Sequence, residues 1–188
     1  MVRRLRLWHD RRERRASARR QSEFAAMPAN VFRFDERWNI PGATVAEVYD
    51  VLSHGERLPQ WWKGVYLDAA KLSDNPEPRV GDRLRVRARG ALPYELNFIL
   101  EATVLDPDRR VQVRTFGDFD GVWTATLSQA GAGVQVDLVW EVTVLRPILK
   151  RLAPLLRPLF AWNHRWTTPR GEQGLKAYLA GRRARPAA

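Results

Sequence analysis

Two side chains in this sequence could move protons inside an otherwise apolar setting. His164 borders the apolar stripe of the longest helical pattern, and Glu36 is a carboxylate on the apolar side of the first alternating segment. Imidazole titrates near neutral pH and could act as a general base for enolisation, or be held by a neighbouring side chain. Glu36 could orient the histidine, bind a ligand hydroxyl or pair with an arginine. We favour an inward ion pair, because a buried carboxylate needs a partner.

Other reaction chemistries find little support in the sequence. The chain has no cysteine, which excludes disulfides, thiolate metal sites and cysteine nucleophiles. His9, His54 and His164 lie far apart, without the spacing of metal ligands. Gly131 and Gly133 lie between two predicted strands and lack the strand–helix context and the lysine of a phosphate loop. We therefore expect no metal and no cofactor, and the sequence leaves open whether the protein is an enzyme.

The net charge of +11 is concentrated at the two ends of the chain. Residues 1–26 hold nine arginines against three acidic residues, and residues 182–188 add three arginines. We expect 1–26 to be a disordered basic extension, or to precede the true start at Met27, and 182–188 to be a basic tail. The tails could contact anionic membranes or nucleic acid weakly, but no specific nucleic-acid site is predicted. The single domain is expected to span residues 27–181.

Alternation of apolar and polar residues predicts seven strands. They cover residues 31–40, 65–72, 82–89, 94–104, 109–116, 122–129 and 134–145. From residue 65 onward the connections are short, which is typical of an antiparallel meander. No apolar run approaches the roughly 18–20 residues needed to span a bilayer, and with no cysteine this favours a cytoplasmic protein.

Helical patterns occur in two places. Thr44 and Glu47 form a capping-box pattern at the start of the first of two short helices that precede the second strand. Apolar residues at steps of three and four predict a long helix over 145–179. Pro154 and Pro158 are expected to set 147–157 apart as a separate piece. We expect Pro169 to kink or break the helix, which Gly171 and Gly174 would loosen further.

These elements predict an α+β fold, in which a seven-stranded curved antiparallel sheet grips a long C-terminal helix, with two short helices between the first and second strands. The order resembles the START-like, polyketide cyclase and dehydrase (SRPBCC) superfamily, whose fold is the helix-grip fold. The matching sequences are at 56–62 (ERLPQWW), 80–82 (VGD), 92–94 (LPY), 121–123 (GVW), 163–166 (NHRW) and 171–175 (GEQGL). The resemblance implies binding of lipids, steroids, aromatics or quinones, or cyclisation of polyketides. It supplies no universal catalytic motif.

An aromatic-lined cavity between the sheet and the C-terminal helix is the predicted site. The residues expected to line it, with Trp61 and Trp62 near its mouth, are Trp38, Trp61, Trp62, Tyr94, Phe98, Phe116, Trp140, Phe160, Asn163 and Trp166. The predicted function is binding or carriage of a hydrophobic small molecule such as a lipid, quinone, aromatic or polyketide-like compound. The alternative is a polyketide cyclase or aromatase-like enzyme that uses His164 and Glu36 as acid and base. A third hypothesis is membrane-surface association through residues 145–162.

Overall fold

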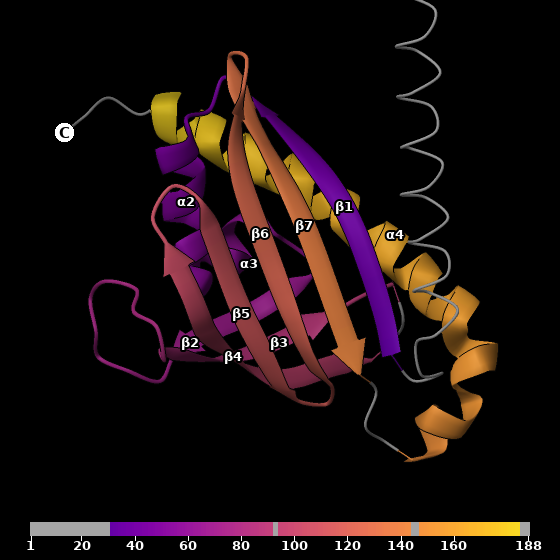
Figure 1. The fold of residues 1–188 in the computed structure, drawn as a ribbon. Coiled ribbons are helices and arrows are strands. Elements are labelled where there is room, and N and C mark those ends of the chain that lie inside the picture. The colour runs from indigo at the N-terminus through magenta and orange to yellow at the C-terminus, as the bar shows by residue number, and fades with distance from the viewer. Residues whose placement is uncertain (1–30, 92–93, 144–146, 185–188) are drawn as a thin grey trace, which may run out of the picture.

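The structure is a computed structural model that describes residues 31–91, 94–143 and 147–184, with the side chains of the last helix described at 158 and from 161 onward. Its elements follow the predicted order (Figure 1). They are β1 (Val31–Pro41), α2 (Val45–Ser53), a short 3-10 turn (Gly55–Arg57), α3 (Leu58–Trp61), β2 (Tyr66–Lys71), β3 (Arg83–Arg89), β4 (Glu95–Asp106), β5 (Arg110–Gly117), β6 (Asp120–Ala130), β7 (Gly133–Thr143) and α4 (Pro147–Ala184).

All seven strands form one antiparallel sheet in the order β1-β7-β6-β5-β4-β3-β2. The meander from β2 to β7 follows from the short connections, and β1 pairs with β7 along its whole length. The sheet therefore ends in β1 on one side and β2 on the other. Figure 1 shows that the sheet curves strongly and that α4 passes behind it. The predicted helix-grip architecture is confirmed.

Local sequence explains the elements that hold the inner face of the sheet. In β1, Phe32, Trp38 and Ile40 are buried while the residues between them are more exposed, as the alternation predicted. The capping box that begins α2 is present, because the Thr44 side chain accepts from the backbone of Glu47 and the Glu47 carboxylate accepts from the backbone of Thr44. Val48, Val51 and Leu52 of α2 are buried, and the helix packs against β5, β6 and β7.

Two β-bulges change which side chains face inward. Between Tyr66 and Asp68 the pairing of β2 with β3 shifts, so that Tyr66 lies opposite Ala88 and Ala69 lies opposite Val86. Both partners are buried, which places Tyr66 on the inner face. A second shift in β4, between Ala102 and Val104, sets Leu105 opposite the buried Val111. Strict alternation along each predicted strand would set Tyr66 on the same face as Asp68, and Val104 on the same face as Ala102, and the bulges change both.

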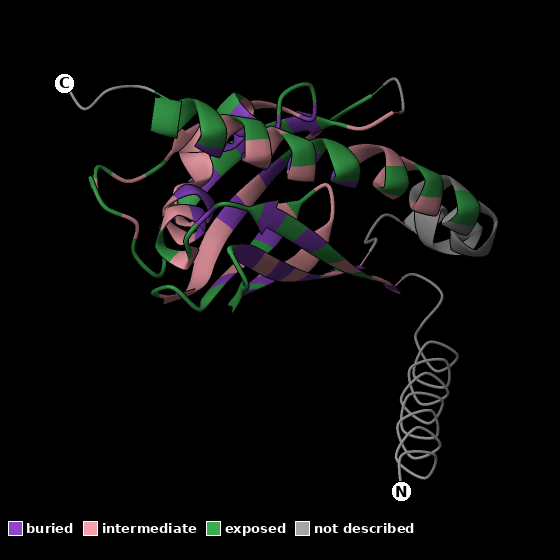
Figure 2. Cartoon of the chain, turned by 90° about the horizontal axis from the view of Figure 1, so that it is seen from above, coloured by how far each residue is buried: buried purple, intermediate pink, exposed green. Residues whose placement is uncertain are grey.

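Helix α4 is one continuous helix from Pro147 to Ala184, so 147–157 is not a separate piece and the helix does not break at Pro169. At Pro169 the physical reason is exposure. The ring removes the hydrogen bond to the carbonyl of Arg165, but both residues lie on the exposed side of the helix, where water can take the place of the missing donor. Figure 2 shows exposed residues along one side of α4 and buried or intermediate ones on the other.

The two central glycines of α4 allow it to approach α3 closely. A Cβ atom on Gly174 would lie 1.8 Å from the carbonyl oxygen of Trp61, and one on Gly171 would lie 2.6 Å from the ring of Trp62. The glycines were expected to loosen the helix. Instead they are the positions at which any larger residue would push the helix away from the tryptophans.

The C-terminal turn of α4 is tied to α2 by ion pairs. The helix continues past the predicted domain end at residue 181, and Arg182 and Arg183 pair with Asp50 and Glu47. These two arginines had been assigned to a basic tail. The predicted extension 1–26 and residues 185–188 lie outside the described residues.

Candidate functional site

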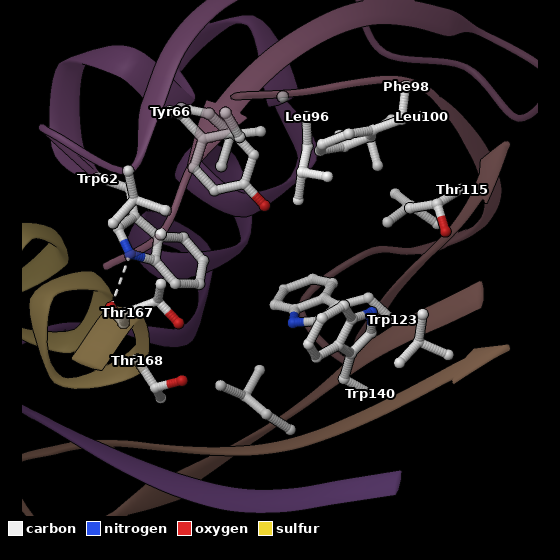
Figure 3. A pocket seen from close by; sticks show the side chains of 18 of the residues that line it. Trp62, Tyr66, Leu96, Phe98, Leu100, Thr115, Trp123, Trp140, Thr167 and Thr168 are labelled. Carbon is white, nitrogen blue, oxygen red and sulfur yellow. Dashed lines mark hydrogen bonds between the residues drawn. The ribbon is translucent and has the colours of Figure 1, made fainter. Parts of the chain in front are cut away.

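A cavity of about 600 Å³ lies between the inner face of the sheet, the short helices and α4. At the end closed by α2 it is lined by aliphatic side chains, including Val51, Leu52, Leu105 and Val111. Aromatic side chains and most of the polar ones line the rest of the cavity. The sheet supplies most of this aromatic region, and the side chains shown in Figure 3 converge on it from α3, α4 and several strands.

His164 and Glu36 meet at the wall of this cavity. The Nε2 atom of His164, on α4, lies 2.6 Å from Oε1 of Glu36, on β1, and both side chains are mostly buried. The imidazole stacks on Phe34 at 3.9 Å between ring centroids and on Trp140 at 5.5 Å. Of the three roles considered for Glu36, the geometry matches the orientation of His164. The contact occupies Nε2, and Nδ1 has no hydrogen-bond partner among the described residues.

Three tryptophans form the wall where α3 meets β1 and α4. The rings of Trp61 and Trp62 stack at 5.2 Å, and Trp38 meets Trp62 edge-on at 5.5 Å. The indole nitrogen of Trp62 donates a hydrogen bond to the carbonyl of Thr167 at 3.0 Å. Trp61 and Trp62 are 3% and 9% exposed, so they belong to the core. The prediction that they lie near the mouth of the cavity is wrong.

Tyr66 projects into the cavity from the opposite edge of the sheet to Glu36. Its ring packs at 5.2 Å against that of Trp62, and Figure 3 shows its hydroxyl directed toward the side where Trp123 and Trp140 lie. Burial raises the pKa of Tyr66 to about 12. The phenol is therefore protonated throughout the physiological range.

One hydrogen bond joins α4 to the β3–β4 connection at the rim of the cavity. The side-chain oxygen of Asn163 accepts from the backbone N–H of Ala91 at 2.8 Å. Gly90 lies directly beneath, and a Cβ atom there would be 2.0 Å from that same oxygen. Tyr94, which is 45% exposed, lines the rim beside them. The carbonyl of Asn163 is thus engaged by the protein itself.

Most of the predicted site residues do line the cavity. Those that do are Glu36, Trp38, Trp61, Trp62, Tyr94, Phe98, Trp140, Asn163 and His164. The two proton-transfer candidates, predicted from different ends of the sequence, are in direct contact. This placement describes geometry, and the roles of these residues in ligand binding or catalysis remain predictions.

Three predicted residues are placed elsewhere or lie outside the description. Phe116 does not line the cavity: the guanidinium of Arg114 lies 4.7 Å above its ring, because the inward positions of β5 are Val111, Val113 and Thr115. Trp166 is also outside the lining and is covered by Arg170 at 3.7 Å. Their placement in the cavity was therefore wrong. The side chain of Phe160 and those of 145–157 lie outside the described residues, as does most of the proposed membrane-contact segment.

Sequence reasoning missed several residues of the lining, chiefly Tyr66, Trp123 and Thr168. Trp123 lies opposite Trp140 in the pairing of β6 with β7, so its inward position could have been inferred from the strand register. Thr168 follows His164 by one helical turn, and that spacing was a usable signal. Tyr66 gave no such signal, because a bulge places it inside.

We also searched the described residues for metal sites and for membrane-spanning helices. Within the part of the chain that the structure describes, no cluster of three histidine or acidic side chains could hold a metal ion. The described helices also include none that is long and apolar enough to cross a membrane.

Solved structures confirm the fold. TTHA0849 from Thermus thermophilus is 19% identical, with a TM-score of 0.65, and the match covers 81% of this chain and 98% of that one. The Zhui aromatase/cyclase from Streptomyces sp. R1128 is 12% identical, with a TM-score of 0.64 and coverage of 84% and 98%. The di-domain ARO/CYC BexL from the BE-7585A biosynthetic pathway is 13% identical, with a TM-score of 0.66 and coverage of 95% and 61%.

The family of the chain follows from its sequence. No curated protein matches it. The model of the family described as polyketide cyclase / dehydrase and lipid transport matches residues 41–165, from the turn after β1 to the part of α4 that contains His164. This agrees with the resemblance to the START-like superfamily drawn from the sequence. The chain belongs to the polyketide cyclase / dehydrase and lipid transport family.

Proposed function

We propose that this protein binds a hydrophobic small molecule in the cavity between the sheet and α4. The observation that supports the proposal is the cavity, whose volume of about 600 Å³ is in the range of sites for drug-sized ligands. Its lining is mostly apolar, with few polar atoms. Lipids, quinones, aromatics and polyketide-like compounds share the chemistry that such a lining accepts, and carriage of one of them is the simplest role.

Titration with N-phenylnaphthylamine, a neutral apolar dye that brightens on leaving water, tests this proposal. The wild type should bind one dye per chain with saturation. Val113→Trp adds an indole to a partly buried position that lines the cavity, and it should weaken binding at least about tenfold because the added ring takes up ligand space.

The matched control is Arg85→Trp, which adds the same ring to an exposed position of β3. Its affinity for the dye should equal that of the wild type. Saturable binding that is the same in all three proteins would place the dye outside the cavity and contradict the proposal. Thermal unfolding of each variant checks that the fold is kept.

A second candidate function is enzymatic, and the contact between His164 and Glu36 at 2.6 Å favours it. With the Nε2 proton held by the carboxylate, Nδ1 is left with the lone pair of a general base. Such a base could remove a proton from the carbon beside a ligand carbonyl and leave an enolate, the first step of a cyclase-like reaction. In that reaction Glu36 would orient the imidazole and stabilise its charged form.

Exchange of the methyl protons of acetylnaphthalene in heavy water, followed by NMR, tests this second function. The wild type should accelerate exchange over buffer, and His164→Gln should abolish the acceleration while dye binding is retained. Glu36→Gln should reduce the rate and alter its pH profile. Exchange at the buffer rate in the wild type would remove the enzymatic candidate and leave the binding proposal intact.

A further inference from the structure

The β-bulge in β2 brings one polar group into the interior that the apolar pattern of the strand does not predict. Residues 67 and 68 together oppose Arg87, and this extra residue turns Tyr66 onto the inner face opposite Ala88. The Tyr66 ring packs on that of Trp62 at a tilt of 54°, and the indole nitrogen of Trp62 donates to the carbonyl of Thr167. The position of the phenol is therefore fixed by α3, α4 and β3 together.

The hydroxyl of Tyr66 has no hydrogen-bond partner among the described residues. The hydroxyl lines the cavity and is therefore open to a partner that the cavity holds. Burial also raises the pKa of this phenol to about 12, so it keeps its proton and acts as a hydrogen-bond donor. The hydroxyl is thus a donor directed into a cavity that offers it no acceptor.

Two further donors line the cavity on the side toward which the hydroxyl points. The indole N–H groups of Trp123 and Trp140, which line the same region, also have no partner among the residues that the structure describes. The carboxylate of Glu36, which also lines the cavity, is already in contact with His164. A ligand that carries an acceptor would satisfy one of these donors, and the flat rings of the two tryptophans favour a planar group.

We propose that the Tyr66 hydroxyl donates a hydrogen bond to a carbonyl oxygen of the ligand, so that the cavity selects planar aromatic ketones or quinone-like compounds over hydrocarbons of the same shape. This inference rests on the proposed binding function and assigns its polar specificity to one residue. The aliphatic end of the cavity, beside α2, then holds whatever side chain the ring carries.

Acetylnaphthalene and ethylnaphthalene form a matched pair of probes, alike in shape but with and without a carbonyl. Quenching of tryptophan fluorescence gives the dissociation constant of each. The wild type should bind the ketone more tightly than the hydrocarbon. In Tyr66→Phe the ketone should bind roughly 5- to 20-fold more weakly, while the hydrocarbon is unaffected, because only the ketone loses a hydrogen bond.

Tyr178→Phe is the control, because it removes a hydroxyl that bonds to Gln60 and does not line the cavity. It should leave both dissociation constants unchanged. Tyr66→Phe should also keep the melting temperature of the ligand-free protein, since the hydroxyl that it removes bonds to none of the described residues.

The outcomes separate this inference from the proposed function. If both probes bind the wild type and Tyr66→Phe weakens neither, or weakens both equally, the inference is overturned and cavity binding stands. A lowered melting temperature in ligand-free Tyr66→Phe would also overturn it, because the hydroxyl would then have a partner within the protein. If the wild type binds neither these probes nor the apolar dye, both the inference and the proposed function fail.

Discussion

The imidazole of His164 and the carboxylate of Glu36 meet at 2.6 Å across the junction between α4 and β1. The contact joins the C-terminal helix to an edge strand of the sheet and lies in the cavity wall. Because both side chains are mostly shielded from water, their interaction is weakly screened. The pair therefore has a structural consequence whether or not it takes part in a reaction.

A double-mutant cycle of Glu36→Ala and His164→Ala should give a coupling energy of about 1–2 kcal/mol near neutral pH, measured by urea unfolding. The exposed pair Arg37–Asp137 serves as the control, and its coupling should lie at about 0–1 kcal/mol because solvent screens it. Equal coupling energies for the two pairs would show that the interior pair gains nothing from its surroundings.

Close packing of α4 on α3 predicts opposite effects for two glycines of the same helix. Gly174→Ala should lower the free energy of unfolding by about 1–3 kcal/mol, because its Cβ would overlap the carbonyl of Trp61. Gly181→Ala meets no atom within 4 Å and should raise that free energy by about 0.5–1 kcal/mol through helix propensity. Chemical denaturation measures both, and a stabilising Gly174→Ala would mean that the helices are not in contact there.

The ion pairs at the end of α4 predict a loss of stability in acid. Burial alone would raise the pKa of Asp50, but hydrogen bonds and charges from Arg182 and Arg57 outweigh it and hold that pKa below its ordinary value of 3.8. The backbone hydrogen bond from Thr44, with help from Arg183, lowers the pKa of Glu47 below 4.5. Both carboxylates bind protons more weakly in the folded state than in the unfolded one.

Their contribution is therefore complete above these ordinary values and is lost as the pH falls through the lower pKa values of the folded state. Asp50→Asn should reduce the melting temperature at neutral pH and flatten its decline in acid. Asp74→Asn, at an exposed loop position, should change neither the melting temperature at neutral pH nor its decline in acid. If the melting temperatures of the wild type and Asp50→Asn fell equally steeply as the pH was lowered, this account would be contradicted.

Asn163 is predicted to hold the rim of the cavity closed. Asn163→Ala removes the acceptor of the Ala91 amide, so hydrogen exchange at that amide should accelerate. The amide of Asn97, which donates to Asp118, is an internal reference and should keep its rate. Dissociation of the apolar dye should also accelerate in stopped-flow measurements. An unchanged rate at Ala91 would show that the hydrogen bond does not restrain the rim.

The sequence was sufficient for the fold because each element carries a local signal. Alternation in β1 and the capping box of α2 both appear in the structure as predicted. The same alternation marked Glu36 as an inward carboxylate, and its contact with His164 joins two elements that lie far apart in the sequence. Those predictions depend only on period and spacing.

The remaining parts of the site depend on register and on contacts between elements. No periodic rule places the extra residue of β2, so the inward position of Tyr66 was not predictable. Phe116 was placed inside by hydrophobicity, yet a neighbouring arginine covers it on the outer face. Glycines in α4 resemble helix breakers in a sequence, and only the position of Trp61 shows why they are required.

Occupation of the cavity is tested most directly by the indole N–H signals of the tryptophans in a proton–nitrogen NMR spectrum during titration with acetylnaphthalene. We expect the signals of Trp123 and Trp140, which line the cavity, to shift with saturation, while that of the exposed Trp162 does not move. Shifts confined to Trp162, or none at Trp123 and Trp140 at saturating probe, would contradict binding in the cavity.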